Sequence, residues 1–247
     1  MRKAALGKAL AILLALLAWQ AGAMLVGEAL LLASPLQVAA RLWALIWQAG
    51  FWRTVLFSFA RIVAGFLLAL LAGGLLAAAA GRFRWLETLL WPWVVTVKSV
   101  PVASFIILCL AWLTARQLPV FISFLMVFPI IYTNLLQGIR SADPQLLEMA
   151  RLFRVPWGRR LRYIWPGQLR PFLLSACSVS LGLAWKAGVT AEIIGIPDGS
   201  IGERLYEAKI YWDSPDLLAW TVVIVAISVC FEKLFVRLLG LALGRRT

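Results

Sequence analysis

Long apolar stretches with almost no charge constrain this chain more than any other feature. Six of them approach or exceed the roughly 20 residues that a tilted helix needs to cross a bilayer. They are Ala9–Gly27, Ile62–Gly81, Thr88–Ala115, Gln117–Ile139, Pro171–Ala191 and Leu217–Phe231. Hydrophobic residues make up 63% of the chain and charged residues 14%, an excess that a soluble core of 247 residues cannot bury. The sequence therefore predicts an all-α membrane protein with about six transmembrane helices.

The basic residues predict how these spans are oriented. The net charge of +13 would suggest a nucleic-acid partner in a soluble protein, but here the basic residues lie mostly between apolar stretches. If the N-terminus is inside, sixteen Lys and Arg fall on that side and five on the other, namely Arg41, Arg53, Arg116, Arg204 and Lys209. The positive-inside rule then predicts a multi-pass membrane protein with both termini cytoplasmic and no nucleic-acid partner.

Several kinds of chemistry are excluded by composition. The chain has no histidine, which removes His-based zinc sites and Ser-His-Asp or Cys-His arrangements. Cys109, Cys177 and Cys230 lie within apolar stretches, so we expect buried free thiols and no metal site. The chain also has no glycine-rich P-loop of the kind that binds ATP.

The segments on either side of the first loop need separate interpretation. Ala21–Ala23 resembles a signal-peptidase site, but the apolar character continues to Ala33, so we expect an uncleaved first helix. Residues 34–53 then predict an amphipathic helix on the outer face. Its apolar stripe has helical spacing and consists of Leu36, Ala39, Ala40, Trp43 and Trp47.

The cytoplasmic loop 141–170 contains two short predicted helices. Asp143 and Pro144 form a helix-start signal, and Pro144 to about Phe153 follows with an apolar stripe. A basic helix over 157–164 is expected to end at Pro166. Periodicity alone leaves two interpretations open: the loop lies on anionic lipid headgroups, or it binds a partner protein.

Motifs in this loop resemble a known family. Glu148-Met149-Ala150, followed by a run that ends at Trp165-Pro166, resembles the Glu-Ala-Ala loop of binding-protein-dependent ABC transporter permeases. Glu148 and Ala150 match, Arg154 stands where glycine is usual, and the spacing to Pro166 is one residue short. Further similarity covers roughly Arg53 to Phe235, in the segments 61–66, 98–101, 181–186 and 191–195. The nearest subgroup comprises nitrate, sulfonate, taurine and bicarbonate permeases and also transporters of thiamine precursors.

The resemblance implies the fold and the partners. It implies a type I ABC importer permease of the bacterial cytoplasmic (inner) membrane, with residues 1–52 as first helix plus external segment, 53–243 as permease core and 244–247 as cytoplasmic tail. Such a permease has no catalytic residues and no cofactor, because the ATP is bound by a partner subunit. The loop 141–170 is called the coupling loop from here on. ABC ATPase subunits, an extracytoplasmic substrate-binding protein and a second permease subunit, in a homodimer, are the implied partners besides the lipid bilayer. ATPase coupling would fall to Asp143, Leu147, Glu148, Ala150, Arg151, Phe153 and Arg154.

Basic residues inside the predicted spans suggest a solute pathway. A charge in mid-membrane costs about 3 kcal/mol on insertion scales, so such residues face protein or a water-filled path. Arg61 is expected to snorkel or to pair with a neighbouring helix. We hypothesise that Lys98 and Lys186 line a pathway that favours an anionic substrate. Their neighbours Ser99, Pro101 and Trp185 complete the predicted pathway set, and we expect the helix to break before Pro101. A Lys186–Glu192 ion pair is the structural alternative.

Two other functional classes stay open on sequence grounds. An integral-membrane enzyme would need an acidic pair such as Asp213 and Asp216, although these also suit helix capping. An ion-coupled secondary transporter would show an internal repeat and carboxylates within spans.

Overall fold

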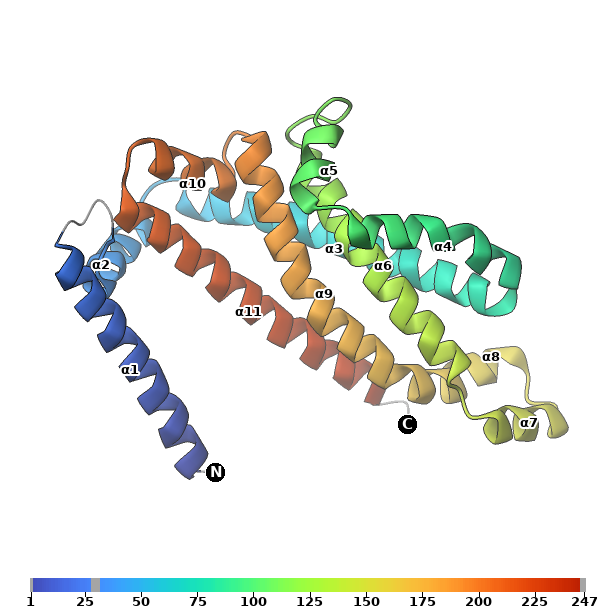
Figure 1. Cartoon of the computed structure of the whole chain (residues 1–247). Coiled ribbons are helices and arrows are strands. Elements are labelled where there is room, and N and C mark those ends of the chain that lie inside the picture. Colours follow the sequence, from blue (N-terminus) through green and yellow to red (C-terminus); the bar gives the residue numbers. More distant parts are fainter. Residues whose placement is uncertain (1, 28–31, 245–247) are drawn as a thin grey trace.

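The computed structural model describes residues 2–27 and 32–244, and every regular element in these ranges is a helix (Figure 1). The elements are α1 Arg2–Val26, α2 Pro35–Ile46, α3 Phe51–Arg82, α4 Arg84–Ser99, α5 Val102–Cys109, α6 Leu118–Arg140, α7 Pro144–Leu152, α8 Trp157–Arg159, a π-helical turn Arg160–Ile164, α9 Trp165–Gly195, α10 Ile201–Ile210 and α11 Ser214–Gly244. The predicted all-α class is confirmed.

Three helices, α3, α6 and α9, form the centre of the molecule and approach one another through small residues. A Cβ placed on Gly65 would lie 2.4 Å from the backbone oxygen of Val120, and one on Gly188 would lie 2.6 Å from Ile62. Ser123 lies at the same level and donates a hydrogen bond to the backbone oxygen of Ala184 at 3.1 Å. Lipid gives helices no hydrophobic reason to associate, so van der Waals contact at such close approach is the main attraction between them.

The remaining helices pack around this centre. Helix α11 lies along α9, and edge-to-face contacts of Phe59 with Phe231 and of Phe66 with Phe235 join it to α3 (Figure 1). Helix α1 reaches the rest through α2, where the Trp19 indole N–H donates to the backbone oxygen of Ala33 at 3.1 Å. The coupling loop lies at the N-terminal end of α9, and the connection to α10 lies at its C-terminal end.

The count of spans differs from the sequence expectation. Among the described residues, three helices are long and apolar enough to cross a membrane: Phe51–Arg82, Leu118–Arg140 and Trp157–Gly195. The pair α4 and α5 makes a fourth if it is one span, with a bend of 105° at the predicted break before Pro101. Spans in α1 and α11, which are 25 and 31 residues long, stay a prediction.

Two predicted helices need correction. Pro166 does not end the basic helix of the coupling loop; α8, the π turn and α9 run on as one 39-residue rod to Gly195. Pro166 follows directly after the π-helical turn Arg160–Ile164, where the regular α-helical hydrogen-bond ladder is already interrupted, so the N–H that proline lacks does not end the rod. Helix α2 ends at Ile46 instead of continuing to residue 53. Val38 and Leu45 lie on its buried side, and the predicted stripe with Trp43 and Trp47 is exposed.

The close approach of α3 to α6 generates a stability prediction. Gly65→Ala forces α3 away from the backbone of α6 and should cost about 1–3 kcal/mol, as overpacking does elsewhere. Gly182→Ala is the matched control, because nothing lies within 4 Å of its added Cβ and helix propensity favours alanine. Thermal unfolding in detergent should show a lower midpoint for the first variant alone; equal midpoints would contradict the packing argument.

Candidate functional site

Helix α7 in the coupling loop is fixed at its N-terminus by Asp143. The Asp143 side chain accepts a hydrogen bond from the backbone N–H of Gln145 at 2.9 Å, and Pro144 occupies the first turn, as predicted. The backbone N–H of Asp143 donates to the Gln168 side chain at 3.4 Å. Since Gln168 belongs to α9, the start of α7 is tied to the base of that helix.

The C-terminus of α7 closes with the hydrogen bonds of a Schellman motif. The backbone N–H of Val155 donates to the oxygen of Ala150 at 2.9 Å, and that of Arg154 donates to Arg151 at 3.0 Å. This turn places Arg154 in the left-handed region at φ 46°. The position is therefore one that favours glycine for steric reasons, as the resemblance implies, and this chain holds it with arginine.

Arg160 braces the same turn and was missed by sequence reasoning. Its Nε donates to the backbone oxygen of Val155 at 2.8 Å, and a terminal nitrogen donates to that of Ala150 at 2.9 Å. The planar guanidinium thus spans the Schellman turn from the π-helical segment below α9. Only the run of arginines at 159–162 hinted at it in the sequence, and charge alone did not separate Arg160 from its neighbours.

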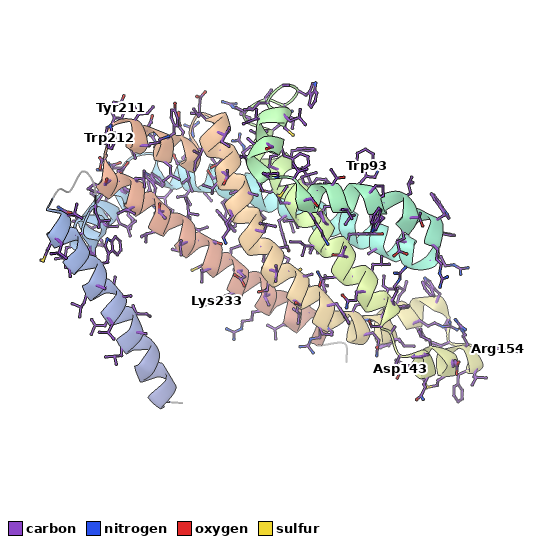
Figure 2. All side chains as sticks on the ribbon, in the orientation of Figure 1. Trp93, Asp143, Arg154, Tyr211, Trp212 and Lys233 are labelled. Carbon is purple, nitrogen blue, oxygen red and sulfur yellow. The ribbon has the colours of Figure 1, made fainter. Side chains whose placement is uncertain are left out.

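The predicted apolar stripe of α7 divides between two sides. Ala150 is fully buried at 0% exposure, whereas Phe153 is 77% exposed; Leu152, which is not part of the predicted stripe, is 82% exposed. Of the other predicted coupling residues, Leu147 is half-buried, and Glu148 and Arg151 are exposed. The outer side of α7 therefore presents apolar side chains among charged ones. Figure 2 shows Asp143 and Arg154 at the end of the molecule away from Tyr211 and Trp212.

The predicted pathway residues separate into two groups. Lys98 is exposed in the last turn of α4, and its Nζ donates to the Thr133 hydroxyl of α6 at 3.3 Å. Ser99 donates its hydroxyl to the oxygen of Val95 in its own helix at 2.9 Å, and Pro101 starts α5. These three residues lie at the break between α4 and α5.

Lys186 and Trp185 point to different sides of α9. Lys186 is exposed. Trp185 is 2% exposed and packs against Phe59 of α3 with ring centroids 6.0 Å apart. The predicted pathway role of Trp185 is therefore corrected: its side chain fills the core between helices and cannot line a water-filled path in this arrangement.

Glu192 lies in the last turn of α9 and belongs to a buried hydrogen-bond network instead of pairing with Lys186. One of its carboxylate oxygens accepts from the Ser58 hydroxyl at 2.7 Å and from the backbone N–H of Gly202 at 3.2 Å. The Ser58 oxygen in turn accepts from the N–H of Ile201 at 2.9 Å. The first amides of α10 are thus satisfied by side chains of α3 and α9, which joins three helices. Within the described residues no Lys186–Glu192 ion pair forms, and Arg61 lies over the Phe57 ring at 3.4 Å.

The acidic pair proposed for an enzyme has structural roles. Asp213 accepts from the backbone N–H of Asp216 at 3.0 Å, and Asp216 forms an ion pair with Arg41 at 2.7 Å. In the part of the chain that the structure describes, no group of three or more Cys, Asp and Glu could hold a metal ion.

Comparison with known proteins shows what this chain is similar to. Residues 69–247 match the family model described as "Binding-protein-dependent transport system inner membrane component". The riboflavin transport system permease protein of Chloroflexus aurantiacus is 29% identical over 242 residues, which cover 94% of this chain and 90% of that protein. A bicarbonate transport system permease protein of Synechococcus elongatus is 24% identical over 185 residues, 74% of this chain and 66% of that protein. A nitrate import permease protein of the same organism is 27% identical over 155 residues, 62% of this chain and 55% of that protein.

The left-handed backbone at Arg154 generates a prediction about the turn after α7. Arg154→Gly should stabilise the turn by about 1 kcal/mol, because glycine adopts this backbone without a Cβ clash. Arg154→Val removes the same charge but adds a β-branched side chain, so it should destabilise the turn. Hydrogen exchange of the Val155 amide should slow in the first variant and accelerate in the second. Identical exchange in both would show that the strain is absent.

Proposed function

The chain belongs to the family of binding-protein-dependent transport system inner membrane components, and we propose that it forms the pathway for a small anionic solute and is driven by ATPase subunits through the coupling loop. Membership in the family makes it the permease component of an ABC transporter, a non-catalytic subunit that works with an ATPase and a binding protein. The finer points are proposals: two copies form one pathway, both termini face the cytoplasm, and the ATP is bound by the partner.

The observation that carries the proposal is the outer side of α7. Leu152 and Phe153 are large apolar side chains that are largely exposed there, and they lie between the charged residues Arg151 and Arg154. An apolar pair inside a charged rim is the usual composition of the centre of a protein–protein contact. A lipid surface would accept the same residues, but the family works with an ATPase, which supports a protein groove as the partner.

The coupling loop is built to transmit movement. Asp143 and Gln168 fix the beginning of α7 to α9, and Arg160 fixes its end. A displacement of α7 would therefore move the base of the 39-residue rod that ends at the Glu192 network. Packed helices respond to such a displacement as rigid bodies, which is how access can alternate between the two sides of a membrane.

The docking surface yields a direct prediction. Phe153→Ala should reduce recovery of the ATPase subunit in co-purification by about tenfold or more, because exposed aromatic anchors commonly contribute about 2 kcal/mol to binding. Trp112→Ala is the matched control, since Trp112 is 75% exposed but lies beyond the coupling loop, in the turn after α5. Equal recovery with both variants would exclude α7 as the docking helix.

The solute class is supported by two exposed lysines on different helices. Lys98 lies at the broken span and Lys186 on the exposed side of α9, and positive charge near a low-dielectric path attracts anions. Two of the relatives carry names that specify bicarbonate and nitrate, both anions, and a third specifies riboflavin. We infer a small anion as the solute.

Uptake assays test the lysines. Lys98→Ala and Lys186→Ala should each lower the uptake of the anion by about tenfold at equal expression, whereas arginine at either position should retain part of the uptake because it keeps the charge. Lys209→Ala, an exposed lysine of α10, serves as the control. Wild-type uptake by both alanine variants would remove these residues from the pathway.

A further inference from the structure

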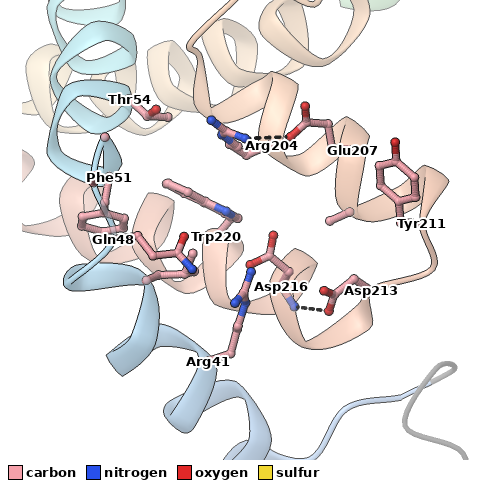
Figure 3. A pocket seen from close by; sticks show the side chains of 14 residues that line it. Arg41, Gln48, Phe51, Thr54, Arg204, Glu207, Tyr211, Asp213, Asp216 and Trp220 are labelled. Atoms are coloured by element: carbon pink, nitrogen blue, oxygen red, sulfur yellow. Dashed lines mark hydrogen bonds and ion pairs between the residues drawn. The ribbon is translucent and has the colours of Figure 1, made fainter.

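A pocket of about 320 Å³ lies where α2, the beginning of α3, α10 and the beginning of α11 meet (Figure 3). We propose that it binds a small zwitterion, an ammonium group joined by a short linker to a phosphate or similar oxyanion. An ethanolamine phospholipid of the outer leaflet or a free solute could supply this group. The proposal is independent of the solute that the transporter carries.

An unpaired hydrogen-bond donor identifies the pocket as a binding site. Trp220 lines it and is 3% exposed, yet its indole N–H has no acceptor among the described residues. Figure 3 shows the indole in the middle of the pocket, between Arg204 and Asp216. A buried N–H without a partner costs about 1–3 kcal/mol, so an acceptor from outside the chain would be bound favourably. The oxyanion end of the ligand supplies that acceptor.

The charges around the pocket require a positive end as well. Two arginines and three carboxylates line it, so the walls carry a net charge of minus one. Arg41 pairs with Asp216 through Nε at 2.7 Å, and Arg204 pairs with Glu207 at 3.0 Å. Asp213 is the third carboxylate and carries the charge in excess. This excess negative charge would repel a simple anion, whereas a zwitterion can place its oxyanion near Trp220 and its ammonium near a carboxylate.

The aromatic side chains around the pocket place it at the level of lipid headgroups. Trp47 and Trp52 flank the turn at its α2 side, and Tyr211 and Trp212 flank its α10 side; all four are exposed. Exposed Trp and Tyr gather at membrane–water interfaces because their rings are amphipathic. The volume equals that of about ten water molecules, which suits a headgroup or a small solute rather than an acyl chain.

The experiment uses the full-length chain, stripped of lipid in detergent, and two kinds of probe. Glycerophosphoethanolamine and glycerophosphate are the soluble pair, measured by ligand-detected NMR. Short-chain phosphatidylethanolamine and phosphatidylglycerol are the lipid pair, measured by native mass spectrometry. We expect the zwitterion of at least one pair to bind about fivefold or more tightly than its anionic counterpart. Preference in the soluble pair indicates a free solute, and preference in the lipid pair alone indicates a headgroup.

Matched variants locate the binding. Trp220→Phe removes the unpaired N–H and should weaken zwitterion binding by roughly five- to tenfold, the effect of one hydrogen bond. Trp185→Phe removes an equally unpaired buried indole N–H outside the pocket and should leave binding unchanged. Glu207→Gln should reduce the preference for the zwitterion, and Asp198→Asn, an exposed carboxylate outside the lining, should not.

Three results would overturn the proposal. They are no binding in either arm, equal binding of zwitterion and anion by the unmodified chain, and equal effects of the Trp220 and Trp185 variants. Should Trp220→Phe fail to fold, the Glu207 and Asp198 pair decides the question, because both side chains lie at the surface.

Discussion

The contact of α3, α6 and α9 at the level of Ser123 is the interaction on which the rest of this structure depends. Gly65 and Gly188 bring the flanking helices against α6, and the Ser123 hydroxyl joins α6 to the backbone of α9. In a bilayer this contact cannot rely on the hydrophobic effect, because lipid tails solvate apolar side chains as well as protein does. Small residues and buried hydrogen bonds therefore hold together the frame to which both functional ends are attached.

One rod of helix connects those ends. Near the start of the rod Trp157–Gly195, Arg160 and Gln168 bond to the two ends of α7, and in its last turn Glu192 bonds to Ser58 and Gly202. At each end, side chains of the rod bond to backbone groups of the neighbouring segments, which makes the connections directional and stiff. A permease needs this stiffness, because movement imposed on one side of the membrane has to reach the other side.

The pocket that Trp220 lines joins two parts of the chain. Its walls come from α2 and the beginning of α3, which precede the family match, and from α10 and α11, which lie within it. The Arg41–Asp216 pair bridges the two parts. A ligand in the pocket would reinforce this bridge, so α2 would be held to α10 and α11 by the ligand as well as by protein contacts.

The sequence by itself determined the all-α class, the start of α7 at Asp143 and the break before Pro101, because apolar stretches, prolines and caps act over a few neighbouring residues. It also determined the family, because motifs along the chain can be compared without a structure. The tertiary structure decided what depends on distant partners. Pro166 continues a helix instead of ending it, and Trp185 fills the core instead of lining a path. Glu192 bonds to Ser58, 134 residues away, and Arg160 alone of its basic run holds a turn. Local pattern could not separate these outcomes, because a buried side chain's role is set by which groups from other helices are close enough to pair with it.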